Sequence, residues 1–552
     1  MAEPNEPLSD PMFPKLSEDQ IAQLSSTGVR RSLPAGEIVF DQGAVGRSLF
    51  VVLKGGLDVV IPSPAGETHV RLQTAGEFTG ELDMVSGRPS LVRARTAGDT
   101  ELLEIDPATL RNIMQTEPEL GEFLLRTFVR RRVGLISRAI GDVVLIGSRH
   151  SADTLRLKEF LARNGHPHTY VELEQDPGVQ DLLDRFGVKP AEIPVLIGND
   201  RHPLRNPSNP EVAQYLGLNA EIDDGRIHDL IVVGAGPSGL AAAVYAASEG
   251  LKVLVLEGIA PGGQAGSSSR IENYLGFPMG ISGQELAGRA FVQAEKFGAQ
   301  VAVARSATAL KCDRRPFRVE CGDADAVRGR ALIIACGAEY RKLPLPNLAR
   351  FEGVGVYYGA TRLEAQLCAD EEVVVIGGGN SAGQAAIFLS TIAKHVHMLV
   401  RGSGLADSMS QYLIRRIEEC SDITLRSRTE VVSLRGNGAL ESVTWKNQDT
   451  GESETHPIRH VFSMAGASPN TAWLQGCVAL DGRQFVKTGS DLTAGDLETA
   501  RWPLRRHPYL FETSVPGVFA VGDVRSGSVK RVASAVGEGS VAIQLVHRVL
   551  AE

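Results

Sequence analysis

The sequence predicts a multidomain α/β protein, and three observations carry this prediction. Short alternating runs of apolar residues, separated by Gly and Pro turns, occupy the first part of the chain and are typical of a β-roll. Alternating strand and helix patterns follow, which favour a small α/β unit. Farther on, two glycine-rich turns each follow a β-branched run and open an Ala-rich helical stretch. We therefore expect a β-roll with helices, a small α/β domain and two Rossmann-like domains.

The β-roll is expected over residues 1–140. Turns separate its apolar runs, which begin at Glu37, Ser48 and Leu57. A helical pattern over 119–140 closes the block. The basic cluster Arg130–Arg132 lies in this helical stretch, and we interpret it as a solvated helix end.

The small α/β domain is expected over residues 141–222. Its predicted strands and helices are strands at 142–146, 169–173 and 194–197, and helices at 151–164 and 178–186. An Asn- and Pro-rich linker at 206–210 and an acidic stretch before residue 226 mark the boundary to the last block. That last block holds both glycine-rich turns.

The two glycine-rich turns predict two dinucleotide sites. A first glycine allows the tight turn, a second lets the backbone approach a pyrophosphate, and a third lets the helix pack closely on the strand. The helix N-terminus then offers unpaired N–H groups to the anion. The first turn carries Gly234, Gly236 and Gly239, and the second carries Gly377 and Gly379.

The residues after each turn distinguish the two nucleotides. Glu257 ends the strand after the first turn, at the spacing where a carboxylate accepts hydrogen bonds from ribose hydroxyls. The equivalent strand after the second turn ends at Arg401, and an arginine pairs with a 2′-phosphate that a carboxylate would repel. The first site is therefore predicted to bind FAD or NAD and the second NADP. Two dinucleotides in one chain indicate electron transfer between them.

The last block resembles the low-molecular-weight thioredoxin reductase family in four motifs. These are Gly262–Gln264, Ile271–Pro278, Leu332–Ala338 and Val515–Val524. The resemblance implies an FAD-binding domain over 226–345 and 467–552, interrupted by an NADPH-binding domain over 346–466 that rotates about hinges near Pro344 and Gly466. It implies FAD and NADPH as cofactors, and it adds to the glycines the site residues Ser238, Gly263, Gln264, Asn273, Asn380, Ser381, Gly522, Asp523, Arg531 and Val532.

One departure from this family concerns its redox-active cysteine pair. At the CxxC position the chain has Gly359, Ala360, Thr361 and Arg362, without sulfur. Cys368 lies in the same segment without a close partner in sequence, and we interpret it as a buried, inert thiol. No catalytic residue is therefore assigned.

The resulting prediction is an FAD-dependent, NADPH-oxidising oxidoreductase of this family, without the cysteine pair and with an electron acceptor still to be identified. The acceptor could be a protein or a small molecule. Two alternatives stay open. One is an enzyme resembling ferredoxin- or flavodoxin-NADP reductases, and the other is a nucleotide-sensing scaffold with little turnover.

The two N-terminal blocks resemble other families. Residues 141–222 resemble a thioredoxin or glutaredoxin domain, in which Ile193–Pro194 would be the cis-proline and Ser151–Thr154 replaces the redox motif without sulfur. Residues 1–140 resemble a cyclic-nucleotide-binding domain, which implies cAMP or cGMP as ligand and regulation by it. The ligand-binding residues that this resemblance implies are Gly80, Glu81, Leu82, Arg88 and Ser90.

Composition and charge narrow the classes of function and the cellular locations that remain. A net charge of −9 spread over 552 residues argues against binding to nucleic acid. The polar start of the chain shows no secretory signal, and we expect a cytoplasmic homodimer without membrane contact. The six cysteines are widely spaced and are predicted to be reduced thiols. No metal site is expected.

Overall fold

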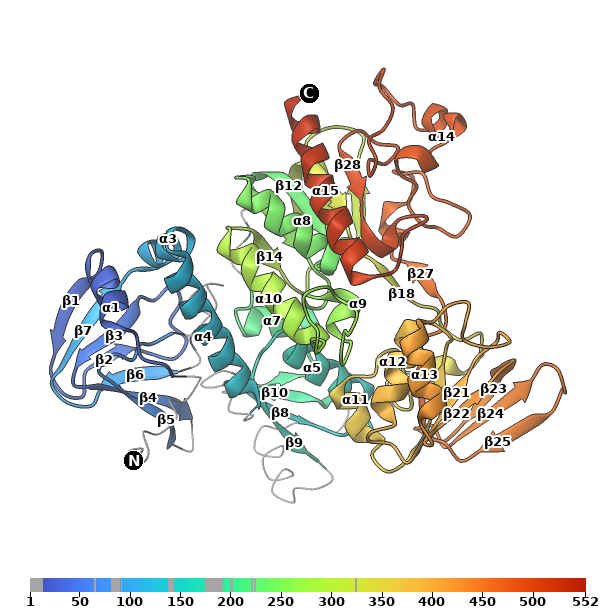
Figure 1. The fold of residues 1–552 in the computed structure, drawn as a ribbon, viewed down its shortest axis with the longest axis horizontal. Helices are drawn as coiled ribbons and strands as arrows, with labels where there is room; N and C mark the ends of the chain where they lie inside the picture. The colour runs from blue at the N-terminus through green and yellow to red at the C-terminus, as the bar shows by residue number, and fades with distance from the viewer. Residues whose placement is uncertain are drawn as a thin grey trace, which may run out of the picture. The chain divides into compact units, whose positions relative to one another are not determined.

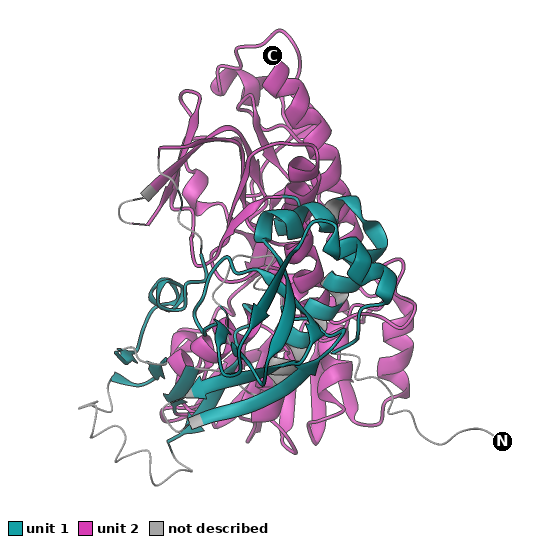
Figure 2. Ribbon diagram, turned by 90° about the vertical axis from the view of Figure 1, so that its left-hand side faces the viewer, with its two compact units in different colours: residues 1–147, 164–222, 295–297 teal, residues 148–163, 223–294, 298–552 magenta. Residues whose placement is uncertain are grey.

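The computed structural model describes residues 13–63, 66–80, 90, 92–137, 143–173, 192–198, 202–219, 222, 225–322 and 325–552. The chain forms two compact units, coloured separately in Figure 2. The first unit comprises residues 1–147, 164–222 and 295–297, and the second comprises 148–163, 223–294 and 298–552.

The N-terminal part of the first unit is a β-roll built from two sheets. Their strand orders are β2-β6-β4-β5 and β1-β7-β3. The strands are β1 (Val29–Leu33), β2 (Ile38–Phe40), β3 (Leu49–Lys54), β4 (Gly56–Ser63), β5 (Gly66–Thr74), β6 (Arg93–Thr96) and β7 (Thr100–Ile105). The helices are α1 (Glu18–Ser25), α3 (Pro107–Thr116) and α4 (Pro118–Ser137). Leu24, Leu110 and Phe128 bring one side chain from each helix into a buried apolar core, so the predicted roll with helices is confirmed.

The rest of the first unit contains a four-stranded sheet in the order β11-β10-β8-β9. β8 (Val143–Gly147) pairs in parallel with β9 (His168–Glu172) and antiparallel with β10 (Val195–Ile197), and β10 continues to β11 (Leu204–Arg205). α7 (Asn209–Tyr215) follows. The Ile193–Pro194 peptide bond before β10 is cis. The helix predicted over 178–186 lies outside the described residues.

The second unit contains two dinucleotide domains, and the first of them carries the first glycine turn. Its sheet has the order β14-β13-β12-β17-β16-β15, with β28 beside β17. Its strands are β12 (Ile227–Val233), β13 (Val253–Leu256), β14 (Gln300–Ala302), β15 (Ala309–Lys311), β16 (Phe317–Cys321), β17 (Asp325–Ile334) and β28 (Val518–Ala520). Its helices are α8 (Pro237–Ser248), α9 (Gly263–Gly266), α10 (Gly283–Lys296), α14 (Ala494–Thr499) and α15 (Val532–Ala551). Helices α8 and α15 lie side by side (Figure 1), because Gly539 lets α15 approach the backbone of α8 closely.

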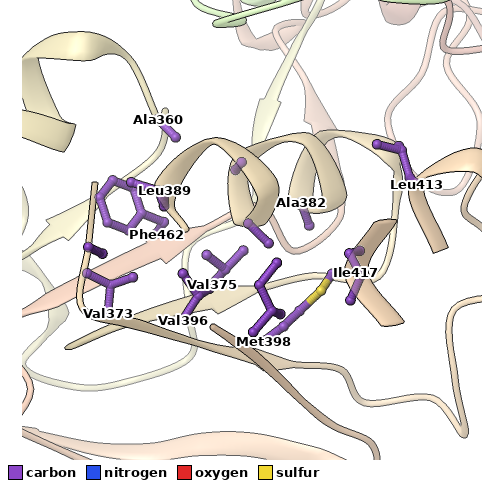
Figure 3. Packing of buried hydrophobic residues seen from close by; sticks show 14 of the residues in the cluster. Ala360, Val373, Val375, Ala382, Leu389, Val396, Met398, Leu413, Ile417 and Phe462 are labelled. Carbon is purple, nitrogen blue, oxygen red and sulfur yellow. The ribbon is translucent and has the colours of Figure 1, made fainter. Parts of the chain in front are cut away.

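The second dinucleotide domain is built on the parallel sheet β19-β26-β20-β21-β22. Its elements are β19 (Val356–Tyr357), α11 (Arg362–Leu367), β20 (Glu372–Ile376), α12 (Asn380–Leu389), β21 (His395–Leu399), α13 (Gln411–Glu419), β22 (Ile423–Arg426) and β26 (His460–Ser463). A three-stranded antiparallel sheet is inserted before β26, with strands β23 (Thr429–Arg435), β24 (Ser442–Asn447) and β25 (Ser453–His456). Figure 3 shows Val375 and Met398 of the sheet packed near Ala382 and Leu389 of α12.

A pair of short antiparallel strands connects the two dinucleotide domains. The chain leaves the first domain through β18 (Ala338–Tyr340) and returns to it through β27 (Ala467–Pro469), and the two strands pair with each other. The second unit also includes α5 (Ala152–Arg163), which precedes both domains in the sequence.

Two of the six cysteines depart from the sequence expectation. Cys312 and Cys477 form a disulfide across 165 residues of sequence, so the prediction that all thiols are reduced is wrong for this pair. The fold brings their Cα atoms to 6.0 Å, a proximity that no local pattern encodes. Among the described residues, we find no helix with the length and apolar character needed to cross a membrane.

Candidate functional site

The first glycine turn joins β12 to α8, and its three glycines meet different surroundings. Gly234 has φ +105°, and a Cβ there would lie 2.4 Å from the carbonyl oxygen of Ala335. At Gly239 a Cβ would lie 1.9 Å from the carbonyl oxygen of Gly234. Only Gly236 faces open space, because its nearest neighbour would be Gly263 Cα at 3.9 Å. Close packing thus explains why Gly234 and Gly239 must be glycines, whereas Gly236 leaves room for a ligand.

Glu257 follows β13 and holds this turn in shape. Its Oε2 accepts from the Ala235 N–H (2.7 Å), and its Oε1 accepts from the N–H groups of Ile259 (2.9 Å) and Ala260 (3.3 Å). A carboxylate offers about four acceptor sites, so capacity for ribose hydroxyls remains. Glu257, which is predicted to bind the ribose, therefore also stabilises the backbone of the turn that would contact the nucleotide.

Asp523 lies in the short 3₁₀ turn Gly522–Val524 that follows β28. Burial raises the pKa of its carboxyl group, and the positive charge of Lys530 opposes this shift only in part. Within the described part of the chain, no hydrogen bond reaches the Asp523 carboxylate. A partly buried carboxylate without a partner is suited to accept from a bound hydroxyl group, as the ribityl chain of FAD would provide.

The residues around Asp523 place it next to the first turn. Gly522 has φ +74°, and a Cβ there would lie 2.5 Å from Ser238 Oγ. The buried Ser238 and Gly522 are thus in direct contact, although 284 positions separate them in the numbering of the chain. Arg531 is the N-cap residue of α15 and Val532 its first helical residue, and no side chain caps this end of the helix. Its unpaired N–H groups remain available to a ligand.

The loop around α9 supplies the remaining predicted residues of the first site. Gly262 and Gly263 both have positive φ, and a Cβ on Gly263 would lie 3.0 Å from Gly236 Cα. The Gln264 side chain donates to the carbonyl oxygen of Ala338 in β18, and Asn273 is exposed. The structure therefore brings Gly263 and Gln264 to the first turn and to the connecting strands, whereas Asn273 lies in the exposed part of the loop.

The second glycine turn joins β20 to α12. A Cβ at Gly377 would lie 2.7 Å from the carbonyl oxygen of Met464, while nothing lies within 4 Å of a Cβ at Gly379. The Asn380 side chain accepts from the Ser410 N–H (2.8 Å), so its oxygen holds the 410 loop. Arg401 follows β21 and is exposed, and its position at the end of this strand suits the predicted 2′-phosphate contact.

The segment at the CxxC position forms a helix start. Thr361 caps α11, and its hydroxyl contacts the buried carboxylate of Glu364 in a capping box. Burial raises the pKa of Glu364, the Thr361 hydrogen bond opposes this, and the charge of Glu159 in α5 adds to the rise. Gly359 and Ala360 precede the helix, and Ala360 lies beside the core shown in Figure 3.

Cys368 ends α11 and is completely buried in the same core. Burial raises the pKa of its thiol to about 12, which keeps the sulfur protonated and unreactive. Burial likewise raises the pKa of Cys336 to about 12. The predicted burial of Cys368 is confirmed, and its inertness stays a prediction.

A small, partly open cavity lies where the two dinucleotide domains meet. Gln264 and Ser267–Ser269 line it from the first domain, and Tyr358–Ala360 and Ser381 line it from the second. Tyr340 of β18 also lines it, where burial raises the pKa of the Tyr340 hydroxyl and a hydrogen bond with Ser381 opposes the rise. The loop beside the first turn and the start of α12 therefore share one polar, uncharged cavity.

In the β-roll, Gly80 and Ser90 flank the predicted nucleotide-binding segment. Arg131 of α4 donates through Nη1 to the carbonyl oxygens of Phe78 (2.9 Å) and Gly80 (2.8 Å), and Ser90 is buried. The interpretation of the basic cluster as a solvated helix end is therefore wrong for Arg131, because two backbone carbonyls bind it in the interior. Glu81, Leu82 and Arg88 lie outside the described residues.

The residues present fit two dinucleotides. Each turn keeps one glycine whose open side has no protein neighbour within 3.5 Å, Gly236 in the first and Gly379 in the second. Each is the N-cap of a helix that no side chain caps. A negatively charged pyrophosphate would complete both sites, and the Asp523 carboxylate adds an acceptor at the first. The fold and the two sites define an oxidoreductase that uses a flavin and a nicotinamide nucleotide.

Comparison with known proteins agrees with this class. The model of the family described as pyridine nucleotide-disulphide oxidoreductase matches residues 228–539, and that of the cyclic nucleotide-binding domain matches residues 30–117. A thioredoxin reductase of Bacillus subtilis is 32% identical over 332 residues, covering 60% of this chain and 97% of that protein. An NADPH-dependent thioredoxin reductase 3 of Arabidopsis thaliana is 32% identical over 331 residues, 59% of this chain and 58% of its own length.

A solved structure gives the same result. The thioredoxin reductase of Lactococcus lactis, in its FR conformation, superposes with a TM-score of 0.52 at 28% identity and covers 59% of this chain and 99% of its own. The chain belongs to the pyridine nucleotide-disulphide oxidoreductase family, within which it is thioredoxin reductase-like, and it carries an additional cyclic nucleotide-binding domain. It is an NAD(P)H-dependent flavin oxidoreductase whose cofactors are FAD and NADPH.

Proposed function

We propose that this enzyme transfers electrons from NADPH through FAD to an external acceptor without a dithiol relay. FAD, when bound, supplies the two-electron chemistry that accepts a hydride equivalent from NADPH. The observation that carries the proposal is that Gly359 and Ala360, at the CxxC position, line the cavity between the domains without a sulfur atom. Cys368, the nearest thiol in sequence, is buried with a raised pKa.

The chain's own residues would bind and orient the cofactors. Gly236 and the uncapped end of α8 would hold the pyrophosphate of FAD, and Asp523 would accept from its ribityl hydroxyls. Gly379 and the start of α12 would hold the pyrophosphate of NADPH, and Arg401 would pair with the 2′-phosphate. We take the boundaries of these domains to be 226–345, 346–466 and 467–552, as the positions of β18 and β27 support.

Two measurements test this proposal. Anaerobic addition of NADPH to the purified protein should bleach the flavin, and dithionitrobenzoate reduction with thioredoxin should remain near background. A robust disulfide reductase rate that persists in Cys368→Ser would contradict the proposal, and a rate that this substitution abolishes would assign catalysis to the lone thiol. Turnover with ferredoxin, flavodoxin, a quinone or dioxygen in parallel would identify the acceptor.

We also infer that residues 141–222 form a thioredoxin-like domain without redox activity. The sheet order β11-β10-β8-β9 and the helix α5 after β8 support this inference. Ser151 and Thr154 occupy the start of α5, where two cysteines would be needed for disulfide exchange. The purified protein should therefore show no insulin-reducing activity with dithiothreitol.

The N-terminal domain, over residues 1–140, is proposed to bind cAMP or cGMP and to regulate the flavin domains. Arg131 supports this, because it connects α4 directly to the carbonyl oxygen of Gly80, where the predicted binding segment begins. Calorimetric titration with cAMP and with cGMP tests binding, and Arg88→Ala should abolish it. Absence of heat and of a melting shift at millimolar nucleotide would contradict the proposal. A homodimer also remains a prediction, which the mass of the protein in solution tests.

A further inference from the structure

Helix α5 contacts both dinucleotide domains. At its N-terminal end, Ala152 lies against Gly353 in the turn before β19, so closely that a Cβ on Gly353 would lie 2.9 Å from Ala152 Cβ. One turn later, Leu155 packs on the apolar core of the second dinucleotide domain, the core that contains Ala360 and Cys368. The first half of α5 therefore rests on the second dinucleotide domain.

The C-terminal end of α5 contacts the first dinucleotide domain. Arg163 Nη2 donates to the carbonyl oxygen of Gly263 (3.0 Å), in the loop beside the first glycine turn. The carbonyl oxygen of Ala162 accepts from Gln284 Nε2 of α10 (2.8 Å). Glu159 pairs with Arg163 one turn earlier (3.2 Å) and orients its guanidinium. Twelve residues of helix span about 18 Å, enough to reach from one domain to the other.

Besides α5, the described residues join the two domains mainly through the connecting segments and through ion pairs such as Lys342–Glu352 (2.9 Å). The chain crosses between them only through the paired strands β18 and β27, among the residues that the structure describes. Arg416 of α13 forms an ion pair with Glu272 (2.8 Å), and both side chains are partly exposed. Exposed ion pairs hold geometry weakly, and β18 and β27 pair over only three residues each. Helix α5 adds to these connections a rigid element that contacts both domains.

In the orientation that α5 supports, the loop beside the first glycine turn and the start of α12 line the same cavity. The cavity between the domains is lined by Gln264 and the serines beside it on one side and by Ser381 at the start of α12 on the other. The NADPH turn thus faces the loop of the flavin site. Without a cysteine pair at 359–362, no thiol has to move from the flavin to the protein surface, so one orientation suffices for electron transfer.

We propose that α5 is a brace that fixes the second dinucleotide domain with its glycine turn toward the flavin loop, and that Arg163 is the positioning residue of this brace. The inference rests on the proposed function, because it explains how hydride transfer proceeds without the domain rotation that the family resemblance implies. It assigns to the thioredoxin-like block a mechanical role in place of disulfide exchange.

The test compares substitutions that remove the contacts between α5 and the first dinucleotide domain with a control substitution that leaves these contacts intact. Arg163→Gln removes the charged donor to Gly263. Gln284→Ala removes the second contact by changing the side chain that the first dinucleotide domain contributes. Arg163→Lys keeps one donor. Arg289→Gln is the control, since Arg289 is exposed and pairs with Glu285 within α10. All variants are made in the full-length, FAD-loaded protein.

The first readout needs no catalysis. Hydrogen exchange of the peptides that contain β18 and β27 should accelerate in Arg163→Gln and Gln284→Ala, and it should match the wild type in Arg289→Gln. Wild-type exchange in both brace variants would overturn the inference. This readout remains valid even if NADPH fails to reduce the flavin, an outcome that would contradict the proposed function instead.

The second readout is the anaerobic rate of flavin reduction by NADPH. At saturating NADPH the limiting rate should fall roughly 10- to 100-fold in Arg163→Gln, because a misplacement of about 1 Å at the reacting centres has that effect. The Kd for NADPH should stay unchanged, since Arg163 contacts neither the second turn nor Arg401. Arg163→Lys should restore part of the rate. An unchanged limiting rate, or a loss confined to NADPH affinity, would refute the assignment of Arg163.

Discussion

Replacing Gly236 with alanine should remove FAD binding while leaving the protein folded. Gly236 has φ −70° and ψ −178°, a conformation open to any residue, and a Cβ there meets no protein atom closer than 3.9 Å. Alanine is a poorer N-cap than glycine, so we expect a change in unfolding free energy of about 1 kcal/mol or less. The added methyl group would instead occupy the path of the pyrophosphate.

Gly239→Ala is the matched control, since it changes the same turn by the same methyl group. A Cβ at Gly239 would lie 1.9 Å from the carbonyl oxygen of Gly234, so the turn and helix would have to separate by about 1.5 Å to reach ordinary contact. Overpacking of this kind costs about 1–3 kcal/mol or more. Because a backbone carbonyl cannot rotate away like a side chain, we expect the upper part of that range.

The assay combines flavin release with thermal unfolding of the FAD-free proteins. FAD-free Gly236→Ala should melt with the FAD-free wild type and fail to regain flavin, whereas FAD-free Gly239→Ala should melt several degrees lower, at roughly 2–4 °C per kcal/mol for a domain of this size. Wild-type FAD affinity in Gly236→Ala would refute the argument that the space beside Gly236 belongs to the pyrophosphate. Unchanged stability of Gly239→Ala would show that the packing argument for the turn is wrong.

Three further predictions concern the other functional residues. Arg401→Ala should weaken NADPH binding by about 1.5–3 kcal/mol, the contribution of a charged hydrogen bond, and should leave NADH binding unchanged; equal losses for both nucleotides in calorimetry would contradict the assignment. Cys368→Ser should leave NADPH turnover unchanged, and Cys368 should resist iodoacetamide in the folded protein, because a pKa of about 12 leaves roughly one thiolate in ten thousand at pH 8. Asp523→Asn should weaken FAD binding. Because burial raises the pKa of Asp523, flavin fluorescence should show release from the wild type on acidification at a higher pH than an ordinary carboxylate would give, and the Asn variant should lack that pH dependence.

The strand–turn–helix units were predictable because their signals are local. The turn at Gly234–Gly239 requires glycines at fixed spacing, and the flanking β-branched run and Ala-rich helix reinforce that requirement. The strands of the β-roll and of the small α/β unit follow from alternation in the same way, and the observed boundaries differ from the predicted ones by one or two residues. The missing sulfur at Gly359–Arg362 is likewise a property of the sequence itself.

The features that sequence reasoning missed all depend on contacts between distant segments. The disulfide joins Cys312 to Cys477 across the whole second dinucleotide domain. Arg131 belongs to a run of three arginines that favours a solvated surface, yet Phe78 and Gly80 supply two carbonyl oxygens that bind it in the interior. The hydrogen bond from Arg163 to Gly263 spans 100 residues. No local pattern distinguishes these residues from their neighbours in the sequence.

The loss of sulfur at two places and the position of α5 have one physical consequence. An enzyme that carries electrons on a dithiol must let that dithiol reach both the flavin and the surface, so a helix spanning both domains would obstruct it. Here Gly359 and Ala360 carry no electrons, and the start of α5 carries none either. A fixed arrangement of the two dinucleotide domains is then compatible with every step of the reaction. It also keeps the nicotinamide site aligned with the flavin site. The acceptor must in turn reach the flavin from outside this arrangement, which favours a small molecule that enters the cavity or a redox protein that transfers electrons without a shared disulfide.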